Sequence, residues 1–335
     1  MENYVERYWD GFLNKCNKNQ DCTFEIGNVR FKVYSNCRWS VSLIKKYLSY
    51  HLIHDNTKEN CFHQIIIFKN TNLKFSDPSF VIKKWKDKLS DGTKLYISKL
   101  NKYYINVKVG KEVSMHIDNY ANRTIIEYID RTLGKKHVHP NPTSYMVSFL
   151  TIVLSYNNNF IIHSASVLDK NKSILILGGP GAGKTTLSLL LSKNGFIFRS
   201  DDLTIISCER NKIYSYPLLL KPKIKSKKYF NLYKYSYRNS LQKSEITKLF
   251  FIKYQKTHSF EFKPLYSFII FKMLYGQLND PKLYLNSKNL VALLFKISDS
   301  IQSYKWEIGP SEKFNKRTFE NILWTILRQI ISLNL

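Results

Sequence analysis

The sequence predicts an α/β protein with a mixed sheet, preceded by an N-terminal α+β unit. Three observations lead to this fold class. A short apolar run at 174–177 is followed by a glycine-rich loop and an apolar helix pattern, the order of a strand–loop–helix core. The first half of the chain shows several short strand patterns and a few helical ones. With 335 residues the chain is too long for one ordinary core, so we expect two domains, 1–155 and 156–335.

The N-terminal unit is expected to contain strands and helices but no catalytic spacing. Alternating apolar residues at 22–34, interrupted by Gly27-Asn28, predict a β-hairpin. Further strands are predicted at 64–68, 94–97, 103–109 and 114–117, and helices at 40–51, 119–133 and 143–156. His137 and His139 have the spacing of a metal pair but no third ligand nearby, so a surface turn before Pro140 is the preferred interpretation.

The second domain begins with a strand pattern at 160–168 and a turn at 169–172. The strand at 174–177 and a helix at 185–193 follow, and Gly195 is expected to cap that helix. Strands are then predicted at 196–200, 203–207 and 213–216. Apolar residues at helical spacing over 319–331, behind a start at Ser311 and Glu312, predict a last helix. This succession indicates a core built on a mixed sheet.

The composition excludes several classes of protein. Hydrophobic residues make up 44% of the chain and aromatic residues 15%, which is enough for a globular core. The longest apolar stretch, 145–156, is shorter than the about 20 residues of a membrane helix, and the N-terminus lacks the apolar region of a signal peptide. The five cysteines lack C-x-x-C and metal-ligand spacing and are expected to be free thiols. We therefore expect a cytoplasmic protein without a membrane partner.

The glycine-rich loop Gly178-x4-Gly183-Lys184-Thr185 fits the P-loop pattern in full. Glycine allows backbone conformations closed to other residues, so consecutive N–H groups can turn inward around phosphate oxygens. The helix that follows directs its positive end at the same phosphates. In this pattern Lys184 neutralises the β- and γ-phosphates and the Thr185 hydroxyl binds Mg²⁺. A glycine-rich turn without function is the alternative, and the flanking strand and helix patterns argue against it.

Asp201 and Asp202 follow a predicted core strand, where a metal-binding carboxylate of a nucleotide site is expected. Adjacent aspartates at a strand end point in different directions, so one can face the metal and the other the attacking hydroxyl. A helix cap or a turn is the alternative, and the nearby P-loop pattern favours the functional interpretation. His163 lies in an apolar strand, where a lone histidine is more often a core residue.

Taken together, His163, the loop 178–185 and the sequence Phe198-Arg-Ser-Asp-Asp202 resemble the catalytic domain of the HPr kinase/phosphorylase family. This family consists of P-loop protein serine kinases related in fold to phosphoenolpyruvate carboxykinase. The resemblance covers about 161–222, with a weaker likeness at 281–285, and implies a P-loop kinase core of that type. It further implies that Asp202 is the base, that Asp201 assists at the metal, and that His163 lines the site. The nucleotide would be held by Gly179, Pro180, Gly181, Ala182, Gly183, Lys184, Thr185 and Thr186.

Departures from the family pattern concern the substrate. Thr186 stands where the bifunctional enzymes usually carry glutamate, and no stretch resembles their Glu-Ile-Arg-Gly signature for the reverse, phosphorolytic reaction. The first 150 residues do not resemble their N-terminal domain. The chain is therefore more similar to HPr-kinase-like proteins of peptide modification, such as lasso-peptide tailoring kinases.

The formal net charge of +27 suggests nucleic-acid binding, but lysines spread along the chain also fit an AT-rich coding sequence. Segment 221–256 is an exception, because it holds eleven Lys and Arg residues, one acidic residue and interleaved tyrosines. We expect a mobile loop that closes over the nucleotide and an acidic peptide, with Lys221 and Lys223 nearest the phosphates. Binding of single-stranded nucleic acid and a solvated basic face are the alternatives.

We therefore expect an ATP-dependent, Mg²⁺-requiring kinase whose acceptor is a hydroxyl, above all a serine of a peptide or protein. GTP in place of ATP stays open, because no base-specificity motif is visible. The alternatives are a nucleotide switch or ATPase that binds nucleic acid or a protein partner, and a small-molecule hydroxyl kinase. We also expect a homo-oligomer, while the role of residues 1–155 stays open.

Overall fold

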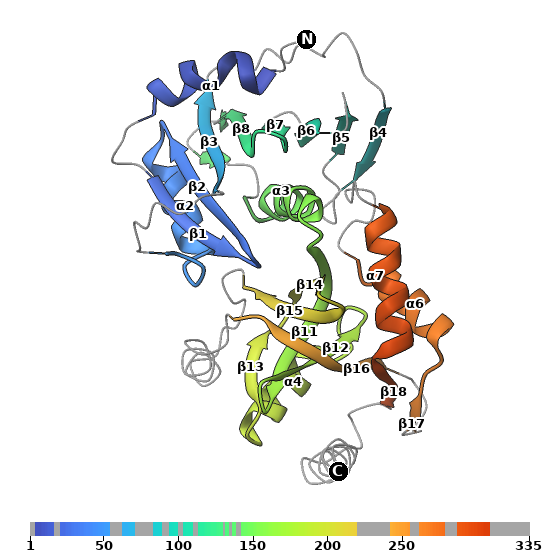
Figure 1. Cartoon of the computed structure of the whole chain (residues 1–335). Helices are drawn as coiled ribbons and strands as arrows, with labels where there is room; N and C mark the ends of the chain where they lie inside the picture. Colours follow the sequence, from blue (N-terminus) through green and yellow to red (C-terminus); the bar gives the residue numbers. More distant parts are fainter. Residues whose placement is uncertain are drawn as a thin grey trace.

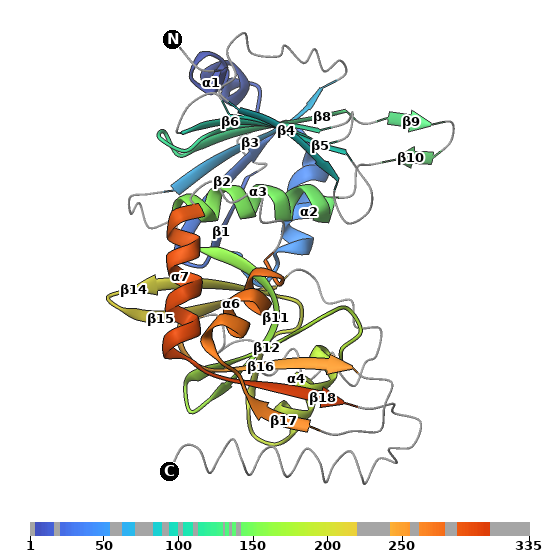
Figure 2. The same cartoon turned by 90° about the vertical axis from the view of Figure 1, so that its right-hand side faces the viewer.

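A computed structural model of the chain contains two large β-sheets with helices packed on them (Figures 1 and 2). The structure describes residues 4–16, 21–53, 62–70, 83–88, 94–99, 103–109, 113–129, 131–133, 136–138, 142–219, 242–254, 261–278 and 287–308. Both views show helix α3 (Pro142–Tyr156) lying between the two sheets. The molecule is therefore layered, with one sheet on each side of a central helix.

The first sheet has eight strands, all from the N-terminal part of the chain. They are β1 (Asp21–Ile26), β2 (Val29–Ser35), β3 (Phe62–Asn70), β4 (Lys83–Lys88), β5 (Lys94–Lys99), β6 (Tyr104–Val109), β7 (Val113–Asp118) and β8 (Arg123–Ile129). Their spatial order is β1-β2-β3-β8-β7-β6-β5-β4. Strand β3 runs parallel to both of its neighbours, and every other pair is antiparallel. The short strands β9 (Arg131–Leu133) and β10 (Lys136–Val138) pair with each other in a separate sheet.

The residue patterns of these strands explain how each is buried. In β1 and β2, Phe24 and Phe31 point into the core and alternate with half-exposed polar residues. Gly27 makes the turn between them with a φ of +66°, so the predicted hairpin is confirmed. Strand β3 instead carries consecutive buried isoleucines, Ile66 packing towards α1 and Ile65 towards α3. A strand covered on both faces reads as a continuous apolar run.

Within the part of the chain that the structure describes, three helices cover the first sheet. Helix α1 (Tyr4–Asn14) packs Trp9 on one face, and α2 (Arg38–Tyr47) and α3 pack on the other. Helix α2 begins and ends earlier than the predicted 40–51, whereas α3 confirms the helix predicted at 143–156. Helix α3 is apolar on all sides because it has a sheet on either side, and Phe149 shares one hydrophobic cluster with Ile161 and Leu203 of the second sheet. That cluster contains residues from both sides of position 155, where the sequence predicts a domain boundary.

The second sheet carries the glycine-rich loop. Its strands are β11 (Phe160–Asp169), β12 (Lys172–Gly178), β14 (Leu203–Glu209), β15 (Lys212–Leu218), β16 (Ser244–Tyr254), β17 (Glu261–Pro264) and β18 (Gln302–Ile308), and β13 (Ile197–Ser200) pairs with β11. Strands β12, β16 and β18 are parallel, and the other pairs are antiparallel. Since β12 pairs with both β11 and β16, the strands β11, β14, β15, β16 and β12 close into a ring. The predicted α/β class with a mixed sheet is thus confirmed.

Helices cover this sheet on two sides. Helix α4 (Lys184–Lys193) packs Leu187 and Leu191 against Ile176 of β12. Helices α6 (Ser267–Tyr275) and α7 (Ser287–Ser300) pack against Leu175 and Leu177 of the same strand. Because side chains alternate along a strand, these two groups lie on opposite faces of the sheet. Strand β12 is consequently covered on both faces, and the loop begins where this buried strand ends.

The helix predicted at 119–133 is wrong, because this stretch contains strands β8 and β9. Asp118 Oδ1 accepts the N–H groups of Tyr120 and Ala121 at 3.0 and 3.1 Å, which turns the chain back after β7. The β-branched Ile125 and Ile126 then pack on opposite faces of the sheet, as suits a central strand. Residues Lys136–Val138 also form a strand where the sequence predicts a surface turn.

The mobile loop predicted over 221–256 is wrong for the part that the structure describes. Residues Ser244–Tyr254 form β16, and Leu249 and Phe251 are fully buried between the helices and the sheet. The rest of that segment, with Lys221 and Lys223, lies outside the described residues, as do the predicted helix at 319–331 and the stretch 281–285. The four described cysteines are free thiols, as predicted. None of the described helices is both long and apolar enough to cross a membrane.

Candidate functional site

The glycine-rich loop joins the end of β12 to the start of α4. Gly178, Gly181 and Gly183 have positive φ angles of 153°, 73° and 94°, which side chains of L-residues rarely permit. Gly178 is required for a second reason, since a Cβ there would lie 2.5 Å from the carbonyl oxygen of Ile252 in β16. A Cβ at Gly179, Gly181 or Gly183 would meet no atom within 4 Å. The loop therefore packs tightly on the sheet at its start and faces open space beyond.

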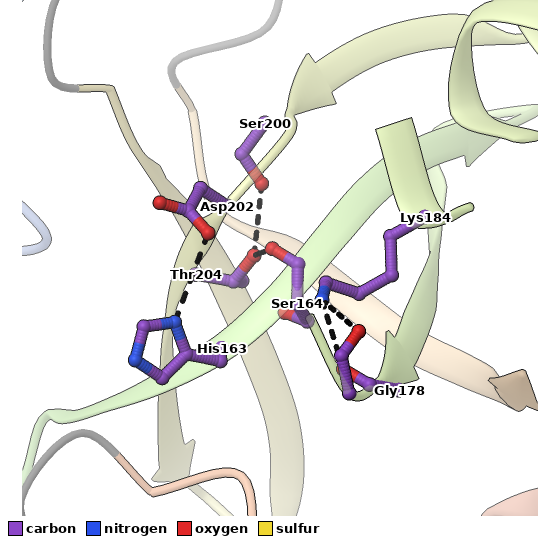
Figure 3. A network of polar contacts seen from close by, with 8 residues as sticks. His163, Ser164, Gly178, Lys184, Ser200, Asp202 and Thr204 are labelled. Atoms are coloured by element: carbon purple, nitrogen blue, oxygen red, sulfur yellow. Dashed lines mark hydrogen bonds and ion pairs between the residues drawn. The ribbon is translucent and has the colours of Figure 1, made fainter. Parts of the chain in front are cut away.

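Lys184, the first residue of α4, is folded back onto this loop (Figure 3). Its Nζ donates to the carbonyl oxygen of Gly178 at 2.8 Å and to that of Gly179 at 3.2 Å. Burial lowers the pKa of the ammonium below its usual value, and the nearby charge of Asp202 acts in the opposite direction. An anionic oxygen is a stronger partner for an ammonium than a carbonyl, so a phosphate in the loop would draw Lys184 away from these two bonds.

Asp202 and His163 face each other from neighbouring elements (Figure 3). His163 Nδ1 lies 3.8 Å from Asp202 Oδ1, and the two side chains are 44% and 58% exposed. The backbone holds this arrangement, because the N–H of Ser164 donates to the Asp202 carbonyl at 3.1 Å and His163 pairs with Leu203 between β11 and β14. His163 is thus a partly exposed residue beside a carboxylate, not a buried core histidine.

A chain of buried hydroxyl groups fixes the turn between β13 and β14, which carries the aspartate pair. Ser200 Oγ lies 2.7 Å from Ser166 Oγ and 2.9 Å from Thr204 Oγ1. Thr204 Oγ1 in turn donates to the carbonyl of Ser164 at 3.3 Å (Figure 3). Ser200 and Thr204 flank the turn, whereas Ser164 and Ser166 belong to β11. Both ends of the turn are therefore tied to the strand that carries His163.

Arg199 anchors β13 to strands β15 and β16. Its guanidinium, fully buried, donates to Ser215 Oγ at 2.8 Å and to the Ser215 carbonyl at 3.3 Å. It also donates to Ser244 Oγ and to the Gln242 carbonyl. Burial lowers the pKa of this group to about 9. A charged residue inside an apolar strand, two positions before the aspartate pair, is the sequence signal that could have marked this anchor.

Gln277 brings a further polar group to the loop from the end of α6. Its side-chain amide lies 3.1 Å from the Gly178 carbonyl oxygen and 3.2 Å from the His163 carbonyl oxygen. Because both neighbours are acceptors, the side-chain amide is assigned with its nitrogen towards them, so that it donates to both. The backbone carbonyl of Gln277 also accepts the backbone N–H of His163 at 2.7 Å. Nothing in the sequence marks Gln277, because its position depends on how α6 packs on the sheet.

The structure brings most of the predicted site residues to one place, where β12 ends, β11 passes and the β13–β14 turn begins. Asp201 shares the turn with Asp202, and Thr185 and Thr186 lie in the first turn of α4. Of the other loop residues, Pro180 is exposed, like Gly179 and Gly181, whereas Ala182 is buried against α4 and β12. Within the described ranges, no three His, Cys, Asp or Glu side chains gather as a metal site. The metal role of Thr185 and Asp201 stays a prediction.

Comparison with known proteins adds little to this geometry. No protein-family model matches the chain, and no curated protein matches it. Among solved structures, the chain is similar to the HPr(Ser) kinase/phosphatase from Coxiella burnetii, with a TM-score of 0.28 and 12% sequence identity. The match covers 51% of this chain and 92% of the other. A similarity this weak carries no argument about the activity, which has to be inferred from the site.

Proposed function

We propose that this chain is an ATP-dependent phosphotransferase with a P-loop kinase core of the HPr kinase type, acting on a serine hydroxyl of a peptide or protein. One observation carries the proposal: Asp202 faces His163 at 3.8 Å, and β11 brings this pair beside the glycine-rich loop, because Ser164 pairs with Leu177 directly before Gly178. A phosphate-binding loop alone would fit any nucleotide-binding protein. An exposed carboxylate beside it adds the base that a hydroxyl acceptor needs.

The loop has the properties that triphosphate binding requires. Its glycines leave open space where side chains would otherwise stand, and its backbone turns into the start of α4. The N–H groups of a helix start attract anionic oxygens, and Lys184 adds a full positive charge. The sequence Gly178-x4-Gly183-Lys184-Thr185 and this geometry agree, so we place the β- and γ-phosphates at the loop.

The donor atoms beside the loop also fit Mg²⁺, which prefers oxygen ligands and keeps several waters. The Thr185 hydroxyl and the Asp201 carboxylate are the groups that would hold the ion. When bound, Mg²⁺ supplies positive charge that offsets the charge of the phosphates.

Asp202 is proposed to accept the proton of the acceptor hydroxyl. The hydroxyl oxygen forms a bond to the γ-phosphorus while the bond from that phosphorus to the bridging oxygen breaks, and ADP leaves. Lys184 stabilises the charge that develops on the phosphoryl oxygens. His163, 3.8 Å from the carboxylate, lines the site beside Asp202. Because both side chains are well exposed, an acceptor as large as a polypeptide can approach them.

The substitution Asp202→Asn tests the role of the base. We expect the rate of phosphoryl transfer to fall about 100-fold or more, as is typical for the loss of a general base, while nucleotide binding persists. Asp169→Asn, at the opposite end of β11, is the matched control and should transfer phosphate at the parental rate. The assay measures transfer of label from γ-labelled ATP to proteins and peptides of a cell extract, with and without excess GTP.

The products of that assay also separate the alternatives. Label on phosphoserine of a polypeptide supports the proposal. Competition by excess GTP shows whether the site distinguishes adenine from guanine nucleotides. Label that appears only as free phosphate would favour a nucleotide switch, and label only on small molecules would favour a small-molecule kinase. Transfer that survives Asp202→Asn at the parental rate would refute the base assignment.

A further inference from the structure

Gln277 occupies a position that packing fixes firmly. Helix α6 ends at Tyr275, and the N–H of Gln277 donates to the carbonyl of Leu274 at 2.9 Å. Its neighbours Leu274 and Leu278 are both buried in the hydrophobic cluster between α6, α7 and the sheet. Leu278 also forms an isolated β-bridge with Ile162 of β11. The backbone of Gln277 therefore has little conformational freedom. Packing of its buried neighbours places its side chain beside the glycine-rich loop.

The Gly178 carbonyl receives two side-chain donors. One is the Lys184 ammonium at 2.8 Å, and the other is the Gln277 amide at 3.1 Å. Gly178 is buried at the end of β12, so its carbonyl cannot exchange these donors freely for water. The same amide also contacts the His163 carbonyl at 3.2 Å. Gln277 thus joins the first residue of the loop to the strand that faces Asp202.

We propose that Gln277 is a positioning residue that keeps the Gly178 carbonyl hydrogen-bonded after Lys184 leaves it to bind phosphate. With Lys184 folded back, either donor satisfies the carbonyl. With Lys184 on a phosphate, the amide of Gln277 is the side-chain donor that stays. A buried carbonyl that loses its donors is costly, so without Gln277 the lysine would be held more tightly on the loop and nucleotide would bind more weakly. The nucleotide part of this proposal rests on the proposed function, whereas the shared carbonyl does not.

A double-mutant cycle in the absence of nucleotide tests the shared carbonyl. The variants are Lys184→Met, Gln277→Leu and the double substitution, each unfolded by urea with intrinsic fluorescence as the signal. Because either donor suffices, each single change should have a small effect and the double change a larger one. We expect the unfolding equilibrium constant of the double variant to exceed the product of the single effects by about 10-fold. If the change in the double variant equals the product of the two single changes within about 2-fold, the proposal is overturned.

A second measurement follows nucleotide binding with a fluorescent ATP analogue. Gln277→Leu should raise the Kd about 10-fold while leaving the unfolding of the nucleotide-free protein nearly unchanged. A residue with a merely structural role would show the opposite pattern. Gln302→Leu, at the exposed start of β18, is the matched control and should leave both quantities as in the parent. An unchanged Kd in Gln277→Leu would contradict the proposal.

The two measurements keep the proposals apart. If the parent protein binds no nucleotide, the proposed function fails, and the cycle without nucleotide still decides whether Gln277 and Lys184 share the carbonyl. If the parent binds nucleotide but Lys184→Met and Gln277→Leu act independently, the proposed role of Gln277 is wrong and the proposed function is unaffected.

Discussion

Gly178→Ala should destabilise this protein more than an alanine at any other glycine of the loop. The new Cβ would lie 2.5 Å from the Ile252 carbonyl oxygen and 3.2 Å from Ala182 Cβ. Ile252 belongs to β16, which pairs with β12 on one side and β18 on the other, so its carbonyl cannot move without disturbing both ladders. Overpacking of this kind costs about 1–3 kcal/mol, and a backbone forced to a rare φ costs about 1–3 kcal/mol more.

The measurement is the free energy of unfolding in urea for three alanine variants of the loop. Gly178→Ala should lose about 2–6 kcal/mol, from overpacking and the rare φ of 153° together. Gly181→Ala meets open space but has a φ of 73°, so its loss should be about 1–2 kcal/mol. Gly179→Ala has neither problem and should stay within about 0.5 kcal/mol of the parent. Equal stability of Gly178→Ala and Gly179→Ala would refute the steric reasoning.

Two further predictions concern the core. His51, whose ring contacts the Glu25 carbonyl and the Leu219 N–H, has its pKa lowered to about 4 by burial, from an ordinary value of 6.5. Its stabilising effect should be complete above pH 6.5 and be lost as the pH falls towards 4, roughly 3 kcal/mol in all, and urea unfolding should show a smaller pH dependence in His51→Gln. Phe149→Ala removes a fully buried ring of α3 and should cost about 3–5 kcal/mol in a single transition, since its cluster joins both sheets. A pH profile of His51→Gln identical to that of the parent would contradict the first expectation. Two separate unfolding steps in Phe149→Ala, of which only one shifts, would contradict the second.

Much of the second sheet follows from local sequence patterns. The strands around 160–168, 174–177 and 203–207 were predictable because apolar runs between turn residues report burial directly. The helix prediction at 119–133 failed because helix-like apolar spacing cannot reveal that Asp118 turns the chain back into the sheet. Strand β16 was missed because its lysines suggested a solvated loop, whereas its position between β12 and β18 buries the apolar residues among them.

The candidate site divides in the same way. The loop Gly178–Thr185 could be recognised from the sequence, because the conformations of a glycine-rich turn depend on consecutive residues. The contacts of Asp202 with His163 and of Gln277 with the Gly178 carbonyl arise from tertiary packing. Those contacts depend on which strands pair and how α6 packs on them, and pairing between distant segments leaves no periodic signal in the chain.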